Sequence, residues 1–188
     1  GWELYIPVAE GEKLWDVLWE SGAKFSAIPV GIGVYGTTGR LEKSYRAYGH
    51  ELETEYNVVE AGMQTPKLKE QDFIGKAAHI AHREAKPVAT LVSLFVDDHK
   101  SKSGENRYMI GKEPILTLAG ETITDAHGRH SYVTSAGSAP SLGKHILMTY
   151  LPTELAVVGA KFLVEYLGER YPVSVAGVGS TPLFDPSN

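Results

Sequence analysis

The 188-residue sequence contains no cysteine, so it forms no disulfide and has no thiolate to bind zinc or attack a substrate. It also has no excess of basic residues. Lys and Arg number 18 against 23 Asp and Glu, and the net charge of −5 argues against the broad basic face of a nucleic-acid-binding protein. No apolar run approaches the roughly 18 residues of a membrane-spanning helix. We therefore expect neither nucleic acid nor a membrane as a partner.

The sequence also has no initiator methionine, and it opens directly on residues 2–8, whose aromatic and β-branched side chains are typical of a strand. A sequence that begins inside a strand is expected to belong to a longer polypeptide. The apolar fraction of 43% and the charged fraction of 22% are ordinary for a globular protein. A chain of this length buries a sizeable core without a metal or disulfide.

Helical patterns dominate the first part of the sequence. Residues 11–22 carry apolar side chains at helical spacing and end at Gly22, which predicts an amphipathic helix. A short helix is expected at 38–47, running into a polar and aromatic loop at 43–60. Asp72 is the expected N-cap of a further helix at 73–84.

After about residue 86 the pattern changes to short strands separated by Gly, Pro, Asn or Asp. Seven strands with turns between them predict a small barrel or sandwich. They are expected at 90–96, 114–118, 122–123, 131–135, 146–151, 161–166 and 171–175. The fold class is therefore α+β: a mixed segment to about residue 86, followed by an all-β domain.

Three motifs invite functional interpretations that their context does not support. Residues 31–36 match G-x-G-x-x-G, but the strand and carboxylate of a dinucleotide-binding unit are missing, so we interpret these glycines as helix-packing positions. His79 and His82 share a helix face, yet zinc would need a third ligand, so we expect no metal. Residues 127–130 are interpreted as a hairpin tip with Gly128 at positive φ.

Four segments, in order and with consistent spacing, resemble motifs of the glycine-cleavage T-protein (aminomethyltransferase) family. They resemble "G-[WF]-E", "R-L-E … Y-G-x-[DE]-[LMI]", "E-A-G … D-F-I-G-[KR]-x-A" and "V-T-S-G-x-x-S-P-x-L-x-K". The segments are Gly1–Tyr5, Arg40–Leu52, Glu60–Ala78 and Val133–Lys144. The helix at 11–22, the run Arg40–Arg46 and the ending Pro182–Pro186 look most similar to the folate domains of dimethylglycine oxidase, dimethylglycine dehydrogenase and sarcosine dehydrogenase.

The resemblance implies that residues 1–86 are the C-terminal part of the folate-binding domain, and that residues 90–188 are the C-terminal barrel domain. The family's catalytic aspartate and most of its pterin pocket would then lie in an N-terminal half outside this sequence. No residue of this chain is therefore predicted to be catalytic. Whether the chain is an enzyme by itself stays open.

The resemblance assigns two charged residues to the cofactor tetrahydrofolate. Glu3 would accept two hydrogen bonds from the ring N–H and the amine on the pterin edge, a charge-assisted bidentate pair. Arg40 lies in a helix of small and apolar residues, so a buried guanidinium would require a carboxylate. It either binds the glutamate tail of folate or pairs with Glu42 or Glu60.

Tyr45 and Tyr48 would offer stacking surface and hydroxyls at the rim of the folate channel, although aromatic residues at such spacing are often core residues. The other implied partners are a small methylated amine substrate and the N-terminal half of the same polypeptide. FAD would belong only to a further upstream module. The resemblance places the protein in the bacterial cytoplasm or the mitochondrial matrix.

Two alternatives share the same fold. One is a folate-dependent demethylase acting on a methoxy or sulfonium methyl group. The other is a non-catalytic regulatory homologue. A third branch, the iron–sulfur assembly factors, carries a cysteine signature that is absent at Glu70–Ala77.

Overall fold

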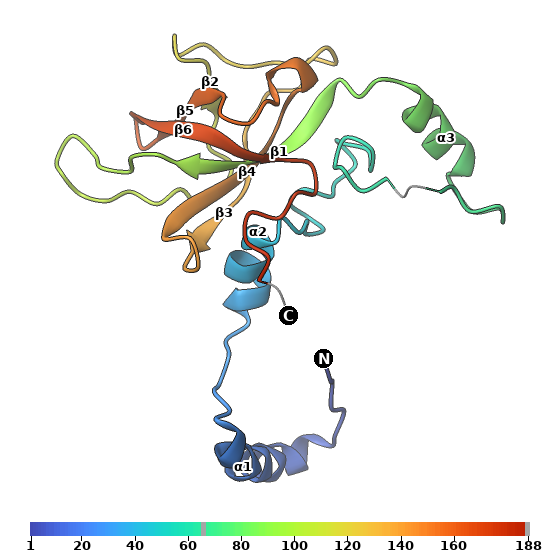
Figure 1. Ribbon diagram of the computed structural model, residues 1–188, viewed down its shortest axis with the longest axis vertical. Helices are drawn as coiled ribbons and strands as arrows, with labels where there is room; N and C mark the ends of the chain where they lie inside the picture. The colour runs from blue at the N-terminus through green and yellow to red at the C-terminus, as the bar shows by residue number, and fades with distance from the viewer. Residues whose placement is uncertain (65–66, 187–188) are drawn as a thin grey trace. The chain divides into compact units, whose positions relative to one another are not determined.

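The structure is a computed structural model that describes residues 1–64 and 67–186. The described residues form two compact units, Gly1–Ile32 and the chain from Gly33 onward. The second unit holds a curled, six-stranded antiparallel sheet together with short helices (Figure 1), so the predicted α+β class is confirmed. None of the described helices is long and apolar enough to cross a lipid bilayer.

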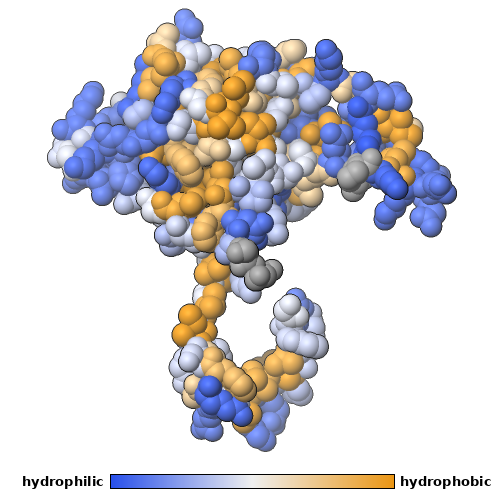
Figure 2. Space-filling model, in the orientation of Figure 1, coloured by the Kyte–Doolittle hydropathy of each residue, from blue (hydrophilic) through white to orange (hydrophobic). Residues whose placement is uncertain are grey.

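The first unit is built around helix α1 (Gly11–Gly22), flanked by 3₁₀ turns at Val8–Glu10 and Ala23–Phe25. The helix has the predicted bounds, and Ser26 stops the following turn with a left-handed φ of 57°. Trp15 and Trp19 stack on one face of α1, with ring centroids 6.1 Å apart. No residue of this unit is buried, and its apolar side chains are open to solvent (Figure 2).

The predicted strand at residues 2–8 is wrong. A strand requires a neighbouring backbone to complete its hydrogen bonds, and no described segment pairs with Gly1–Pro7. The aromatic residues that indicated a strand, Trp2 and Tyr5, are instead 97% and 89% exposed.

The sheet of the second unit contains six of the expected strands, in the spatial order β2-β5-β6-β1-β4-β3. Their bounds are β1 Ala89–Val96, β2 Ile115–Leu116, β3 Val133–Ala139, β4 Lys144–Pro152, β5 Lys161–Tyr166 and β6 Glu169–Val178. Register shifts at Ser93/Leu94 and Val133/Ser135 mark irregularities that help the sheet to curl. The seventh expected strand, 122–123, makes only an isolated bridge between Thr122 and Leu116.

Both faces of the sheet are buried. Side chains of alternating positions fill the inside of the curl, including Leu94, Leu147 and Val173. The opposite face carries a second cluster that includes Ile146, Met148 and Tyr150, and it is covered by Leu41 and Ala61 from the segment 39–62. This covering segment contains most of the candidate site residues.

Two of the predicted helices have bounds that differ from the prediction. The helix expected at 38–47 is a π-helical stretch at Val34–Thr38 followed by α2 (Gly39–Glu42), and it ends early because Ser44 takes a left-handed φ of 55°. Helix α3 spans Lys76–Glu84, and its N-cap is Gly75 with φ 85°. Asp72 is therefore not the cap, since the turn at Gly75 delays the start of the helix. The loop predicted at 43–60 is confirmed.

Candidate functional site

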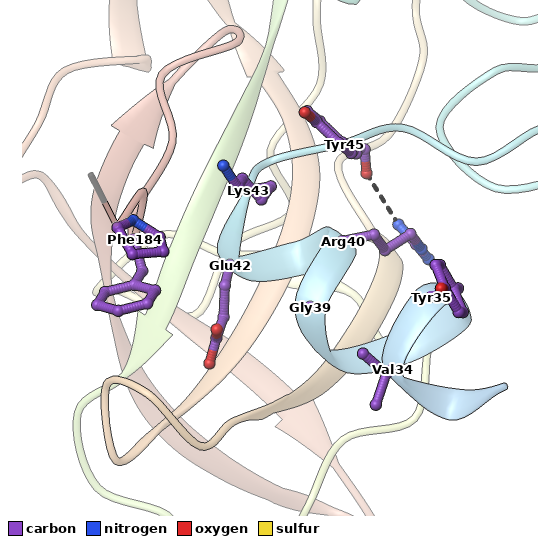
Figure 3. A pocket seen from close by; sticks show the side chains of 9 residues that line it. Val34, Tyr35, Gly39, Arg40, Glu42, Lys43, Tyr45 and Phe184 are labelled. Carbon is purple, nitrogen blue, oxygen red and sulfur yellow. Dashed lines mark hydrogen bonds between the residues drawn. The ribbon is translucent and has the colours of Figure 1, made fainter. Parts of the chain in front are cut away.

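A groove of about 360 Å³ lies beside the end of α2 (Figure 3). Helix side chains form one wall, and the C-terminal tail forms another. The lining residues are Val34, Tyr35, Gly39, Arg40, Glu42, Lys43, Tyr45, Phe184 and Pro186. Tyr35, Tyr45 and Phe184 give it exposed aromatic surface, at 76%, 59% and 37% exposure.

Arg40 lines this groove and is held in place by several hydrogen bonds. Its side chain is only 9% exposed, and its Nη1 lies 3.1 Å from a carboxylate oxygen of Glu51. Nε donates to the Gly36 carbonyl at 2.6 Å, Nη1 donates to the Tyr45 carbonyl at 3.2 Å, and Nη2 donates to the Ser135 hydroxyl at 2.8 Å. The guanidinium therefore ties α2, the following loop and β3 together.

The predicted burial of Arg40 and its need for a carboxylate are confirmed, but the predicted structural partners are wrong. Glu42 accepts hydrogen bonds from the Ser141 amide at 2.9 Å and hydroxyl at 2.8 Å. Residues two apart on a helix do not face each other, so Glu42 points away from Arg40. Glu60 pairs with Arg129 instead.

Glu51 is the buried counter-ion of Arg40, with none of its side chain exposed. One of its oxygens accepts from Arg40 and from the Ala47 amide at 3.1 Å, and the other accepts from the Thr134 hydroxyl at 2.7 Å. A buried carboxylate needs such partners to offset its loss of water. The Glu51 backbone carbonyl also accepts a hydrogen bond from the Tyr150 hydroxyl at 2.8 Å.

A second buried network fastens the far end of the covering segment. Arg129 donates to Glu60 at 2.5 Å and to Asp125 at 2.7 Å, with side-chain exposures of 14%, 2% and 3% respectively. Burial alone would raise the pKa of Asp125, but hydrogen bonds from Arg129 and the His127 amide hold it below its usual range. The guanidinium lies 4.2 Å over the Tyr56 ring, which stacks on Tyr150.

The C-terminal tail is attached to the end of α2 by backbone contacts. The Leu183 and Phe184 amides both donate to the Glu42 carbonyl, at 2.9 and 3.0 Å. The Ser44 hydroxyl donates to the Thr181 carbonyl at 2.8 Å. Lys43 forms an ion pair with Asp185, and this hydrogen bond raises the pKa of the Lys43 ammonium.

Of the three predicted folate residues that lie in the second unit, the structure brings two together. Arg40 and Tyr45 line the same groove. Tyr48 is 88% exposed and lies outside the groove lining, bridged to Leu52. Glu3 belongs to the first unit, where its exposed carboxylate accepts a hydrogen bond from the Tyr5 hydroxyl at 2.6 Å.

The other motifs take structural positions. Gly128 has φ 79° at the tip of the predicted hairpin, which is confirmed by the bridge between Thr124 and His130. Within 1–64 and 67–186 no cluster of three or more His, Cys, Asp or Glu side chains is arranged to hold a metal ion. The glycine that packs most closely against the helical segment 34–42 is not in 31–36 but is Gly137 of β3.

Glu51 and Arg129 were not among the predicted site residues, although both organise the groove and its supporting segment. Glu51 lies within a segment that carried the family resemblance, which was the one available signal. Arg129 appeared only as part of a hairpin tip. Its partner Glu60 is 69 positions away in the sequence, so the pairing is a tertiary contact that local patterns do not reveal.

Comparisons with known proteins match both parts of the chain. Residues 1–66 match the family described as GCVT N-terminal domain, and residues 108–185 match the Glycine cleavage T-protein C-terminal barrel domain. An aminomethyltransferase of Acidobacterium capsulatum is 33% identical over 172 residues, covering 88% of this chain. The mitochondrial dimethylglycine dehydrogenase of Mus musculus is 32% identical over 183 residues, covering 93% of this chain.

The fold also has a solved counterpart. The crystal structure of glycine cleavage system aminomethyltransferase T from Bartonella henselae superimposes with a TM-score of 0.60 over 72% of this chain, at 21% identity. This chain spans less than half of these relatives: 41% of the Acidobacterium protein, 19% of the mouse protein and 35% of the Bartonella chain.

Proposed function

The chain belongs to the glycine-cleavage T-protein family, and from this we propose that it is the C-terminal part of a tetrahydrofolate-dependent enzyme of one-carbon metabolism. The observation that supports this most is the match of both family domains, in order, along one chain. In this proposal residues 1–86 complete the folate-binding domain and residues 90–188 form the barrel domain.

The similarity to a dimethylglycine dehydrogenase over 93% of the chain favours a more specific role. The chain would be the folate module of a flavoprotein that oxidises dimethylglycine or sarcosine, with FAD bound in a separate upstream module. Bacterial and mitochondrial relatives fit a bacterial cytoplasm or a mitochondrial matrix. Tetrahydrofolate, when bound, supplies the nitrogen that accepts the one-carbon unit.

Each unit, taken by itself, contains residues whose chemistry suits a part of folate. Glu3 offers an exposed carboxylate that accepts two adjacent N–H donors of a pterin edge. The groove at the end of α2 offers an apolar, aromatic surface to the ring and tail of the cofactor. Arg40 shapes this groove by holding the Tyr45 backbone, and the Tyr45 side chain provides stacking surface in it. Tyr48 offers its exposed ring outside the groove lining.

The N-terminal half of the same polypeptide is the proposed macromolecular partner. The first unit presents large apolar side chains to solvent, among them Trp2, Phe25 and Ile28 at 97%, 76% and 77% exposure. Surface of this kind marks a protein interface. The catalytic aspartate of the proposal lies in that partner, so the chain on its own binds and orients but does not complete the reaction.

Glu3→Gln in the longer polypeptide tests the proposal. The substitution keeps the size of the side chain but replaces one acceptor with an amide donor, which then faces a pterin donor. Hydrogen bonds to charged groups contribute roughly 1.5–3 kcal/mol each. We expect tetrahydrofolate affinity to fall on the order of tenfold to a few hundredfold, measured by titration, with thermal stability unchanged.

Glu12→Gln is the matched control, because Glu12 is an exposed glutamate of α1 in the same unit. It should leave folate affinity unchanged. Oxidation of the amine at a flavin module, if the polypeptide has one, should persist in both variants. A folded Glu3→Gln protein with wild-type folate affinity would refute the assigned role.

A further inference from the structure

Lys43 is the charged residue of the α2 groove whose contacts are easiest to exchange. It follows the last residue of α2, and its ammonium pairs with Asp185 of the tail. The two side chains are 36% and 56% exposed. Exposed ion pairs contribute little to stability, so breaking this pair costs little free energy.

The other charged groups of the groove already have hydrogen-bond partners within the fold. Arg40 is buried, and its guanidinium is bonded to Glu51, Tyr45, Gly36 and Ser135. Glu42 receives the amide and hydroxyl of Ser141, and Figure 3 shows its carboxylate and the Lys43 ammonium leaving the end of α2 in different directions. Among the described residues that line the groove, Lys43 alone carries an exposed charge.

The tail does not depend on this ion pair to stay in place. The Leu183 and Phe184 amides of the tail donate hydrogen bonds to the Glu42 carbonyl, and the Thr181 carbonyl accepts a hydrogen bond from the Ser44 hydroxyl. Leu183 also packs against the cluster on the outer face of the sheet. Asp185 can therefore release Lys43 while the preceding tail residues keep their contacts.

We propose that Lys43 binds the carboxylate tail of the ligand in this groove, and that Asp185 occupies the Lys43 ammonium until that carboxylate displaces it. The inference rests on the proposed function, in which the ligand is the p-aminobenzoyl-glutamate arm of folate. The benzoyl ring lies against the aromatic lining, and the glutamate carboxylates reach Lys43. A longer γ-linked glutamate chain brings more carboxylates and competes better with Asp185.

The test uses the 188-residue chain, whose second unit contains every residue of the groove. The probes are p-aminobenzoyl-monoglutamate and p-aminobenzoyl-triglutamate, titrated while backbone amide resonances are followed by NMR. Lys43→Gln should weaken triglutamate binding about two- to five-fold, in line with exposed ion pairs. Asp185→Asn should strengthen it by a similar factor, because it removes the competitor.

Lys161→Gln is the matched control, since Lys161 also forms an exposed ion pair, with Asp97, outside the groove. This variant should leave the affinity for both probes unchanged. Opposite effects of Lys43→Gln and Asp185→Asn support the exchange, because a purely structural ion pair would respond in the same direction to both. Weakening by both variants, no change in either, or no binding of the probes at millimolar concentration would overturn it.

The outcome can be separated from that of the proposed function. If Glu3→Gln weakens tetrahydrofolate binding while the Lys43 and Asp185 variants bind the probes with wild-type affinity, only the tail-exchange inference fails. If the two variants shift tail binding in opposite directions while Glu3→Gln has no effect, the tail-exchange result stands and the pterin assignment fails.

Discussion

At the scale of single residues, three glutamates hold the segment 39–62 on the sheet. Glu42, Glu51 and Glu60 are 6%, 0% and 2% exposed. Each carboxylate accepts a hydrogen bond from a residue in or beside the sheet, and the donors are Ser141, Thr134 and Arg129 respectively. Since these contacts hold the segment that carries Arg40 and Tyr45, the geometry of the candidate site depends on three buried carboxylates, of which only Glu42 lines the groove itself.

Arg129→Met should be strongly destabilising, because it leaves two buried carboxylates without their cation. Breaking a buried ion pair in this way costs about 3–5 kcal/mol. Arg170→Met is the matched control. Arg170 pairs with Glu165 at 47% and 39% exposure, so its loss should cost under about 1 kcal/mol. Denaturant unfolding at neutral pH measures both.

The cost of Arg129→Met should also shrink in acid. The pKa of Asp125 is lowered in the folded protein, so its ionised form adds stability above the unfolded pKa of about 3.9. That contribution is lost as the pH falls through the lower folded pKa. In the variant, Asp125 loses a cation that favours its charge and takes up a proton more readily. A cost that is constant or larger at acid pH would contradict this assignment.

The sequence predicted the environment of Arg40 but not its partner. A guanidinium among small and apolar helix residues was expected to be buried and paired. The choice of Glu51 over Glu42 or Glu60 depends on where the loop after α2 returns to the sheet, which side-chain patterns do not encode. Tyr48 shows the same limit, since its exposure of 88% follows from the path of the loop.

At the scale of elements, the π-helical stretch Val34–Thr38 and the α2 helix that follows it lie directly against β3 because Gly137 has no side chain. A Cβ on Gly137 would lie 2.1 Å from the Thr37 carbonyl oxygen and 2.8 Å from a methyl carbon of Leu41. The helix backbone cannot move aside without disturbing Leu41, which is fully buried. This contact sets how closely the helix that carries Arg40 approaches the sheet.

Gly137→Ala should therefore lower stability by about 1–3 kcal/mol, the usual cost of overpacking. Gly36→Ala is the matched control within the neighbouring helix. A Cβ there meets nothing within 4 Å, so it should be neutral or stabilising by about 0.5–1 kcal/mol. Thermal unfolding followed by circular dichroism compares the two, and equal melting temperatures would show that α2 is not held against β3 as described.

Elements with strong local signals were predicted well, and those that depend on neighbours were not. Helix α1 at 11–22 and strand β5 at 161–166 have the predicted bounds, because periodicity and terminating glycines agree there. β3 runs from 133 to 139 rather than 131 to 135, since pairing with β4 carries it through small residues with low strand propensity. Residues 2–8 have strand-like composition but lack a pairing neighbour among the described residues.

At the scale of the whole molecule, the two units differ in how they are stabilised. The sheet unit has two buried clusters, one on each face. The unit Gly1–Ile32 has no buried residue, and a helix of 12 residues is marginal in water without tertiary packing. The chain should therefore not unfold as a single two-state system.

Tryptophan fluorescence can report this difference, because all three tryptophans, Trp2, Trp15 and Trp19, lie in the first unit. In a denaturant titration, the tryptophan signal should change at a lower concentration than the far-UV circular dichroism of the sheet, and non-coincident probes are the standard sign of departure from two-state unfolding. Leu147→Ala, a fully buried core truncation, should lower the circular dichroism midpoint through a loss of about 2–5 kcal/mol and leave the tryptophan transition in place. Coincident transitions, or a tryptophan midpoint that follows Leu147→Ala, would instead mean that the first unit draws its stability from the sheet.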